Sequence, residues 1–160
     1  MLRIIISAMD GNCKSILVSA CLHGEACRYD GKSSPCAAAI ALAETCNLIP
    51  VCPEQLGGLP TPRMPSEIQP DGRVVDAAGI DRTAAFEAGA RKALLIAREH
   101  GCTQAILKAN SPSCGTRHIY DGTFSGTLVP GRGKTAALFE DSGIEVLSEA
   151  DLRESLNASQ

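Results

Sequence analysis

Three short apolar runs in this chain are typical of buried strands. Each run ends near a cysteine, and a glycine or a proline follows that cysteine closely. The three stretches are ILVSACLHG (16–24), LIPVCPEQLGG (48–58) and AILKANSPSCG (105–115). Their cysteines are Cys21, Cys52 and Cys114, and only the third stands at the end of a short loop. Short apolar runs bounded by turn-forming residues favour strands that are buried on both faces, as in a parallel sheet covered by helices.

Segments with helical patterns separate these runs. Ser34 can cap a helix from Pro35 to about Thr45, and the longest helix is predicted from Asp81 or Thr83 to about His100, where Gly101 ends it. Two shorter helices are expected at 135–141 and after Ser148. Strands are predicted at 15–20, 47–51, 104–108 and 144–147. The stretches 52–72 and 110–133 contain too many glycines and prolines for regular structure. The alternation predicts one α/β domain with a mostly parallel sheet.

Length and charge limit the classes of function. A chain of 160 residues suits one compact domain, which we place at 15–160, with residues 1–14 as an N-terminal extension or an edge strand. No apolar run approaches the roughly 18 residues that cross a bilayer, and no signal peptide is evident, so a cytoplasmic protein without membrane contacts is expected. The net charge of -3 argues against strong binding to a nucleic-acid backbone.

Eight cysteines are unusual for a chain expected in a reducing compartment. Metal ligation or catalysis therefore becomes the favoured explanation for some of them. Cys36 and Cys46 lie in an alanine-rich helical segment, where we expect them to pack as small hydrophobic residues. Cys21, Cys52 and Cys114 differ, because ligands of open α/β sheets gather outside the carboxyl ends of the strands. If the three strands are parallel neighbours, their thiols meet at one edge of the sheet and form a ligand set.

The identity of the bound metal is not decided by cysteine spacing. Structural zinc usually takes four protein ligands, commonly in closely spaced pairs, and the sequence contains no C-x2-C pair. An iron–sulfur cluster with only three protein ligands would keep one iron open to an exogenous molecule. Such an iron is a Lewis acid that favours a soft donor such as sulfur.

Four segments carry a family resemblance: SACLHGEACRYDGK, VCPEQLGGLPTPRMPSEI, AILKANSPSCG and IYDGTFSGTLVPGRGKTAAL. With SACL, CPE and SPSCG in this order, residues 15 to 149 resemble the DUF523 family of thiouracil desulfidases. The resemblance implies a three-layer, Rossmann-like domain and a 4Fe-4S cluster held by three cysteines with one open iron. It also implies conversion of 2-thiouracil or 4-thiouracil to uracil without net redox change, on the free base or on its nucleoside or nucleotide, with the sulfur taken up by the open iron. A cluster of this kind makes the iron–sulfur assembly machinery an expected partner.

Carried onto matching positions, the resemblance makes Cys21, Cys52 and Cys114 the cluster ligands and Glu54 and Ser111 the catalytic groups. The loops CRYDGK and PTPRMP are expected to border the same edge of the sheet. The first loop contributes Arg28, which can pair with Asp30, and Tyr29, which can stack on a pyrimidine, and the second contributes Arg63. Ser113 is assigned to the substrate side, with its hydroxyl serving the turn around Cys114.

Two positions depart from the usual motif or complicate the ligand set. His23 stands where the family commonly has an apolar residue. Cys27 lies six positions after Cys21 and is a possible fourth ligand that would close the open iron. Separately, the segment PGRGKT lacks the first glycine of a phosphate loop, although its turn and Lys134 are suited to an anion.

Two alternatives of other classes stay open at this stage. The chain could be a metal or iron–sulfur binding module without catalysis, which would need the three thiols but not Glu54. It could also be an enzyme with a cysteine nucleophile and no metal, for which His23 or His118 would supply the base.

Overall fold

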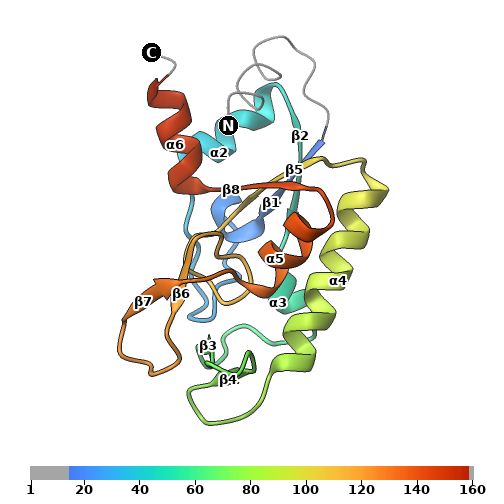
Figure 1. Ribbon diagram of the computed structural model, residues 1–160. Coiled ribbons are helices and arrows are strands. Elements are labelled where there is room, and N and C mark those ends of the chain that lie inside the picture. The colour runs from blue at the N-terminus through green and yellow to red at the C-terminus, as the bar shows by residue number, and fades with distance from the viewer. Residues whose placement is uncertain (1–14, 159–160) are drawn as a thin grey trace.

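The structure is a computed structural model that describes residues 15–158, so the predicted extension or edge strand at 1–14 lies outside the described residues. Figure 1 shows the chain as a sheet with helices on both faces and two small hairpins at one end. In chain order the main-sheet strands are β1 (Ser15–Ser19), β2 (Asn47–Val51), β5 (Gln104–Leu107) and β8 (Glu145–Ser148). The helices are η1 (Ala20–His23), α2 (Ala37–Ala41), η2 (Leu42–Glu44), α3 (Pro53–Leu56), α4 (Thr83–Glu99), α5 (Lys134–Asp141) and α6 (Glu149–Ala158).

The main sheet has the strand order β2-β1-β5-β8, and every neighbouring pair is parallel. This confirms the predicted parallel α/β sheet. The chain leaves β1 toward β2 on one side and returns as β5 on the other, so the strand order reverses between β1 and β5. Crevices at such reversal points, outside the carboxyl ends of the strands, are the usual ligand sites of this architecture.

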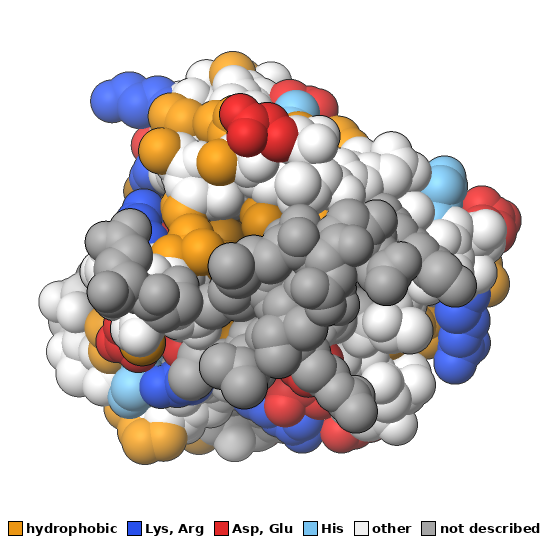
Figure 2. Space-filling view, turned by 90° about the horizontal axis from the view of Figure 1, so that it is seen from above, with side chains coloured by type: hydrophobic (Ala, Val, Ile, Leu, Met, Phe, Trp, Pro, Cys, Tyr) orange, Lys and Arg blue, Asp and Glu red, His pale blue; other side chains and the backbone are white. Residues whose placement is uncertain are grey.

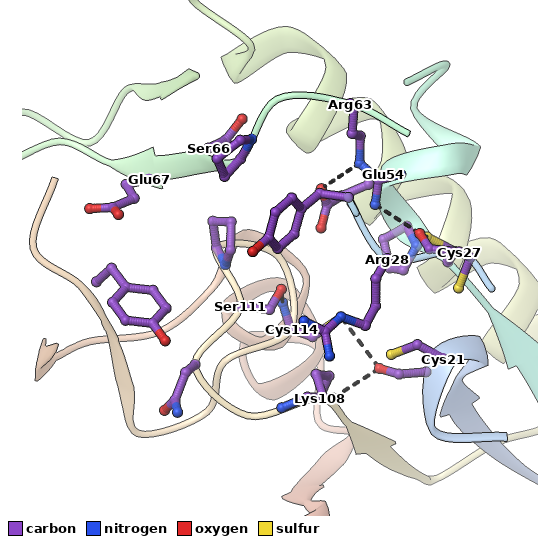
Figure 3. A pocket seen from close by; sticks show the side chains of 18 of the residues that line it. Cys21, Cys27, Arg28, Glu54, Arg63, Ser66, Glu67, Lys108, Ser111 and Cys114 are labelled. Atoms are coloured by element: carbon purple, nitrogen blue, oxygen red, sulfur yellow. Dashed lines mark hydrogen bonds and ion pairs between the residues drawn. The ribbon is translucent and has the colours of Figure 1, made fainter. Parts of the chain in front are cut away.

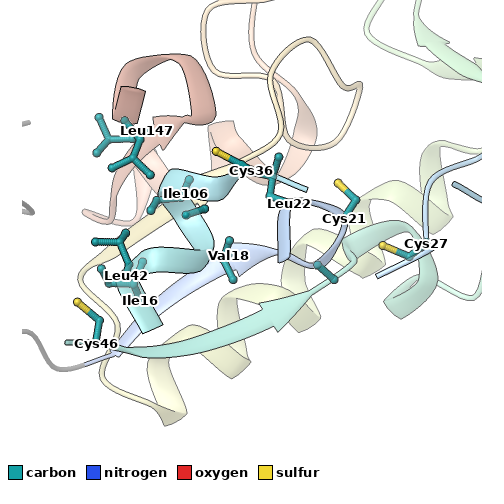
Figure 4. Packing of buried hydrophobic residues seen from close by; sticks show 13 residues of the cluster. Ile16, Val18, Cys21, Leu22, Cys27, Cys36, Leu42, Cys46, Ile106 and Leu147 are labelled. Atoms are coloured by element: carbon teal, nitrogen blue, oxygen red, sulfur yellow. The ribbon is translucent and has the colours of Figure 1, made fainter. Parts of the chain in front are cut away.

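Alternating side chains of the strands build a core on each face of the sheet. Ile16, Val18 and Ile106 pack with α2 and α6 on one face (Figure 4). Leu17 and Leu107 pack with α4 and α5 on the other face. Because strands buried on both faces need apolar residues at every position, this arrangement explains the continuous apolar runs in the sequence. The three-layer domain is confirmed.

Two stretches that we expected to be irregular contain regular structure. Residues 52–72 include α3 and the strand β3 (Ser66–Ile68), which pairs antiparallel with β4 (Val74–Asp76). Residues 110–133 include β6 (His118–Tyr120) and β7 (Leu128–Pro130), which form a second antiparallel hairpin. The predicted helix from 35 to 45 is shorter and is divided into α2 and η2. Three-residue strands give too little alternation for a sequence pattern to reveal them.

Cys36 and Cys46 are buried in the core next to α2, as expected for small hydrophobic residues. Cys46 is in addition disulfide-bonded, which the sequence did not indicate.

The described surface carries mixed charges. On the face shown in Figure 2, basic and acidic side chains lie interspersed around hydrophobic ones. Among residues 15–158, no helix combines the length and the hydropathy that crossing a membrane requires.

Candidate active site

A pocket of about 590 Å³ lies at the carboxyl ends of β1, β2 and β5. Residues that directly follow these strands line it, and so do residues of both hairpins. In Figure 3, Glu67 lies on the side of the pocket opposite Cys21 and Cys27, with Glu54 and Ser111 between them. The pocket therefore occupies the crevice where the strand order reverses.

The three cysteines selected from the sequence all line this pocket. Cys21 lies in η1, which follows β1 without a break. Cys52 is the residue between β2 and α3, and Cys114 lies in the loop that follows β5. The parallel order of the strands brings together thiols that are far apart in the chain.

The Cys114 sulfur is held by the ends of two neighbouring strands. Ser19, the last residue of β1, donates a hydrogen bond from Oγ to Cys114 Sγ at 3.4 Å, and it accepts one from the Lys108 backbone N–H at 2.9 Å. Burial raises the pKa of the Cys114 thiol to about 12, although the Ser19 hydroxyl opposes the shift. A buried thiol of this kind is inert as a nucleophile, but it loses its proton when it binds a metal.

The loop around Cys114 is fastened to the first turn of α5. The backbone N–H groups of Lys134 and Thr135 donate to the carbonyls of Pro112 and Ser113 at 2.9 and 2.8 Å. Gly133 permits this contact, because a Cβ there would lie 2.4 Å from the Ser113 carbonyl carbon. The N–H groups that would hold an anion at PGRGKT are therefore used to support Cys114.

Cys27 lines the same pocket and interacts with two of the selected cysteines. Hydrogen bonding with Cys21 is the largest cause that raises the pKa of Cys27 to about 11, and burial adds to it. Hydrogen bonding with Cys27, followed by burial, raises the pKa of Cys52 well above its usual range. The pocket thus contains four thiols, and sequence spacing alone had left the place of Cys27 open.

The donor set fits a cluster better than a single metal ion. Within residues 15–158, no three His, Cys, Asp or Glu side chains lie close enough together to hold one ion. An iron–sulfur cluster is bound differently, because each cysteine ligates a different iron and the thiolates surround a larger body. Three buried or half-buried thiols on the wall of a roomy pocket meet that requirement.

Glu54, in the first turn of α3, faces the pocket beside an almost completely buried arginine. Arg63 Nε donates to Glu54 Oε1 at 3.0 Å, and the two side chains are 7% and 18% exposed. Burial raises the pKa of Glu54, and the Arg63 charge opposes that rise. Within the described part of the chain, no hydrogen bond reaches Oε2, the second carboxylate oxygen. Glu54 can therefore accept a proton from a bound molecule.

Close backbone packing places α3, and with it Cys52 and Glu54. A Cβ at Gly89 of α4 would lie 1.9 Å from the Pro53 carbonyl oxygen, and a Cβ at Gly57 would lie 2.0 Å from the Ala85 carbonyl oxygen. The missing side chains let the two helices touch through their backbones. This contact sets the depth of Glu54 in the pocket.

Ser111 and Ser113 have different surroundings. Ser111 lines the pocket, and its Oγ accepts hydrogen bonds from the N–H groups of Ser113 and Cys114, each at 3.0 Å. Since a hydroxyl has two acceptor sites and one donor, its proton is what remains for a ligand. Ser113 does not line the pocket: its side chain is buried, and its Oγ pairs with Thr135 Oγ1 at 2.8 Å. Its hydroxyl thus serves the turn around Cys114, as expected, but Ser113 does not line the substrate side of the pocket to which we assigned it.

The loop after η1 contributes the predicted Arg28 and Tyr29. Both line the pocket, and Arg28 forms the expected pair with Asp30, with Nη2 3.2 Å from Oδ2. Tyr29 is 42% exposed, so its ring is accessible to a ligand. His23 and His118 are absent from the described lining of the pocket.

Sequence reasoning missed several residues of the pocket. Arg63 was expected to border it, but its bond to Glu54 has no signature in the sequence. Lys108, which pairs with Glu149 at 2.9 Å, was also missed. The same holds for Glu67, Tyr120 and Phe124, which the two hairpins bring to the pocket.

Comparisons with known proteins show the family of the chain. A family model described as 2-thiouracil desulfurase matches residues 16–151. The chain is 42% identical over 150 residues to the uncharacterized protein YbbK of Bacillus subtilis, covering 88% of this chain and 99% of the relative. Among solved structures, the chain matches the [4Fe-4S]-dependent thiouracil desulfidase TudS with a TM-score of 0.78 and 44% identity, covering 91% of this chain and 97% of the other.

Proposed function

Because the chain belongs to the 2-thiouracil desulfurase family, we propose that it is a thiouracil desulfidase that depends on a 4Fe-4S cluster. The carrying observation is that Cys21, Cys52 and Cys114 line one pocket together with Glu54 and Ser111. These are the five residues to which we assign the ligand set and the catalytic roles. The substrate is a small thiolated pyrimidine that enters the pocket and leaves as uracil.

Cys21, Cys52 and Cys114 would hold the cluster as thiolates. With only three protein ligands, the bound cluster supplies one iron that is open to a soft donor such as a thiocarbonyl sulfur. The Ser19 hydroxyl would stabilise the charge on the Cys114 sulfur, because it already donates to that atom.

Glu54 would act as the general base. Its free carboxylate oxygen takes a proton from a water molecule, whose oxygen attacks the thiocarbonyl carbon of the substrate. A C=O bond replaces the C=S bond: the water supplies the oxygen, its two protons leave with the sulfur as hydrogen sulfide, one of them by way of Glu54, and the carbon keeps its oxidation state. General base catalysis of this kind contributes about 10²- to 10⁴-fold in rate.

Ser111 would orient the substrate or the water. Both acceptor sites of its hydroxyl are occupied by backbone N–H groups, so it can only donate to the ligand. A donor at this position suits an oxygen or nitrogen atom of the pyrimidine that carries a lone pair. Arg28 and Tyr29 border the same space and would contact the ring or a group attached to it.

The test uses protein purified anaerobically and reconstituted with iron and sulfide. We expect it to release sulfide from 2-thiouracil or 4-thiouracil and to form an equal amount of uracil. Glu54→Gln keeps the size of the side chain and should lower kcat about 10²-fold or more, with the cluster still bound. Ser111→Ala should also lower the rate of turnover. Ser113→Ala removes a hydroxyl that does not reach the substrate, so it should not weaken substrate contacts. Full turnover by Glu54→Gln with an intact cluster would reject the assigned role.

The same measurements separate the alternative functions. A binding module would hold the cluster but release no sulfide from any of the substrates. An enzyme with a cysteine nucleophile would work without iron, but the raised pKa values of Cys27, Cys52 and Cys114 do not favour a reactive thiolate.

A further inference from the structure

The few aromatic side chains of this protein gather at the pocket. The chain has two tyrosines, three phenylalanines and no tryptophan. Tyr29, Tyr120 and Phe124 all line the pocket. The two remaining phenylalanines, Phe86 and Phe139, are fully buried in the core. Every tyrosine and phenylalanine ring outside the core therefore borders the same space.

The backbone at Phe124 is held in an unusual conformation. Phe124 has a φ of 57°, in the left-handed region where a bulky residue is a genuine outlier. Such conformations persist where the surrounding structure determines them, and they gather at ligand sites. Phe124 is nevertheless 39% exposed, so burial of its side chain in the ligand-free protein does not account for this backbone conformation.

Glu67 of β3 holds the segment that carries Phe124. Its Oε1 accepts hydrogen bonds from the N–H groups of Gly122 and Phe124, at 3.0 and 3.1 Å. Gln69 adds a third bond, from Nε2 to the Gly122 carbonyl oxygen at 3.1 Å. Glu67 is only 9% exposed, so a buried carboxylate of one hairpin fastens the tip of the other.

From these observations we propose that Phe124 and Tyr120 are specificity-determining residues that stack on the flat ring of the substrate, and that Glu67 is the positioning residue that presents Phe124. This inference rests on the proposed function and deepens it. The selected class is a thiocarbonyl within a planar heteroaromatic ring. An acyclic thiocarbonyl compound such as thiourea carries the same sulfur group but offers no ring to stack on.

The first test compares turnover of 2-thiouracil and thiourea by reconstituted protein. Phe124→Ala should raise KM for 2-thiouracil about tenfold, since loss of base–aromatic stacking commonly costs a factor of that order. The effect should fall on KM more than on kcat. Phe124→Tyr keeps an aromatic ring, so its KM should be close to that of the unaltered protein. Leu128→Ala is the matched control, because Leu128 is exposed on the same hairpin and does not line the pocket. An equal rise in KM for thiourea would overturn the proposal.

Glu67 is tested by a pair of substitutions. Glu67→Ala removes the acceptor for both N–H groups and should reproduce the KM of Phe124→Ala. Glu67→Gln retains a side-chain oxygen and should behave close to the unaltered protein. If Glu67→Ala kept the original KM, the positioning role would be wrong.

A binding measurement does not depend on turnover. Phe124→Trp introduces the only tryptophan of the chain, so its fluorescence reports on the mouth of the pocket alone. Uracil should quench this signal saturably, whereas Leu128→Trp should not respond. Unchanged Phe124→Trp fluorescence at saturating uracil would overturn the stacking proposal. Quenching in a protein that releases no sulfide would instead reject the proposed function, while it would support stacking of the ring on Phe124.

Discussion

Arg63 binds the Glu54 carboxylate through its Nε at 3.0 Å, and the rest of its guanidinium joins two loops of the pocket. Nη2 donates to the Cys27 carbonyl oxygen at 3.0 Å, and Nη1 donates to the Thr61 hydroxyl at 2.8 Å. One buried side chain therefore fixes the position of the proposed base relative to the segment that carries Cys27.

Arg63→Ala should lower kcat, because misplacement of a catalytic group by about 1 Å can cost on the order of 10² in rate. Arg63→Lys should recover only part of the rate, since lysine lacks the planar fork that bonds several acceptors at once. Steady-state kinetics of the reconstituted variants provides the measurement, with iron content determined in parallel. Arg73→Ala is the control, because Arg73 forms an exposed pair with Asp71 outside the pocket. Unaltered kcat in Arg63→Ala would show that Glu54 does not need this support.

The proposed ligand set makes Cys27 dispensable for the cluster. Cys21→Ser, Cys52→Ser and Cys114→Ser should each lose bound iron and the visible absorbance of the cluster after reconstitution. Cys27→Ser should keep both, and Cys102→Ala serves as a control in the core away from the pocket. Iron analysis and absorption spectra of the five variants are the readout. If Cys27→Ser lost iron and Cys114→Ser retained it, the third ligand would be Cys27 and not Cys114.

The backbone contact between α3 and α4 predicts an unusual response to alanine. Helix propensity alone would make Gly89→Ala stabilising by about 0.5–1 kcal/mol. The new Cβ would instead lie 1.9 Å from the Pro53 carbonyl oxygen, so we expect a loss of about 1–3 kcal/mol in the free energy of unfolding. Urea denaturation tests this, with Ala88→Gly in the same helix as a reference for helix propensity. Stabilisation by Gly89→Ala would show that α3 can move away from α4 at little cost.

A buried carboxylate in the first hairpin predicts how stability depends on pH. Asp76 Oδ1 accepts hydrogen bonds from the N–H groups of Ala78 and Ile80 at 2.9 and 3.0 Å, and Oδ2 pairs with Arg82. The bond from Ile80 is the largest cause that lowers the pKa of Asp76 below its ordinary value of 3.8. A lowered pKa in the folded state means that this stabilisation is present above the unfolded-state pKa and is lost as the pH falls through the folded value.

Asp76→Asn should therefore reduce the midpoint of thermal unfolding at pH 7 and make the midpoint less sensitive to pH below about 4. Thermal unfolding between pH 3 and 7 measures both effects. Asp71→Asn is the matched control, because the Asp71 side chain is 56% exposed and solvent weakens its pair with Arg73. An Asp76→Asn variant with the same pH dependence as the unaltered protein would contradict the expectation.

Local patterns in the sequence were sufficient to predict the parallel sheet and the three thiols at its edge. Apolar runs marked β1, β2 and β5, and the residues that follow them include Cys21, Cys52 and Cys114. This worked because burial on both faces of a strand leaves a continuous signal within a few residues, and because parallel strands place their carboxyl ends together.

Only the tertiary structure decided which other residues share the pocket. Three contacts join segments that share no sequence pattern. They are the bond between Arg63 and Glu54, the approach of Cys27 to Cys21 and Cys52, and the hydrogen bonds from the segment of Phe124 to Glu67. Such contacts depend on how loops and short hairpins pack against the finished sheet. A hydrogen bond between residues 57 positions apart leaves no trace in the residues beside either partner.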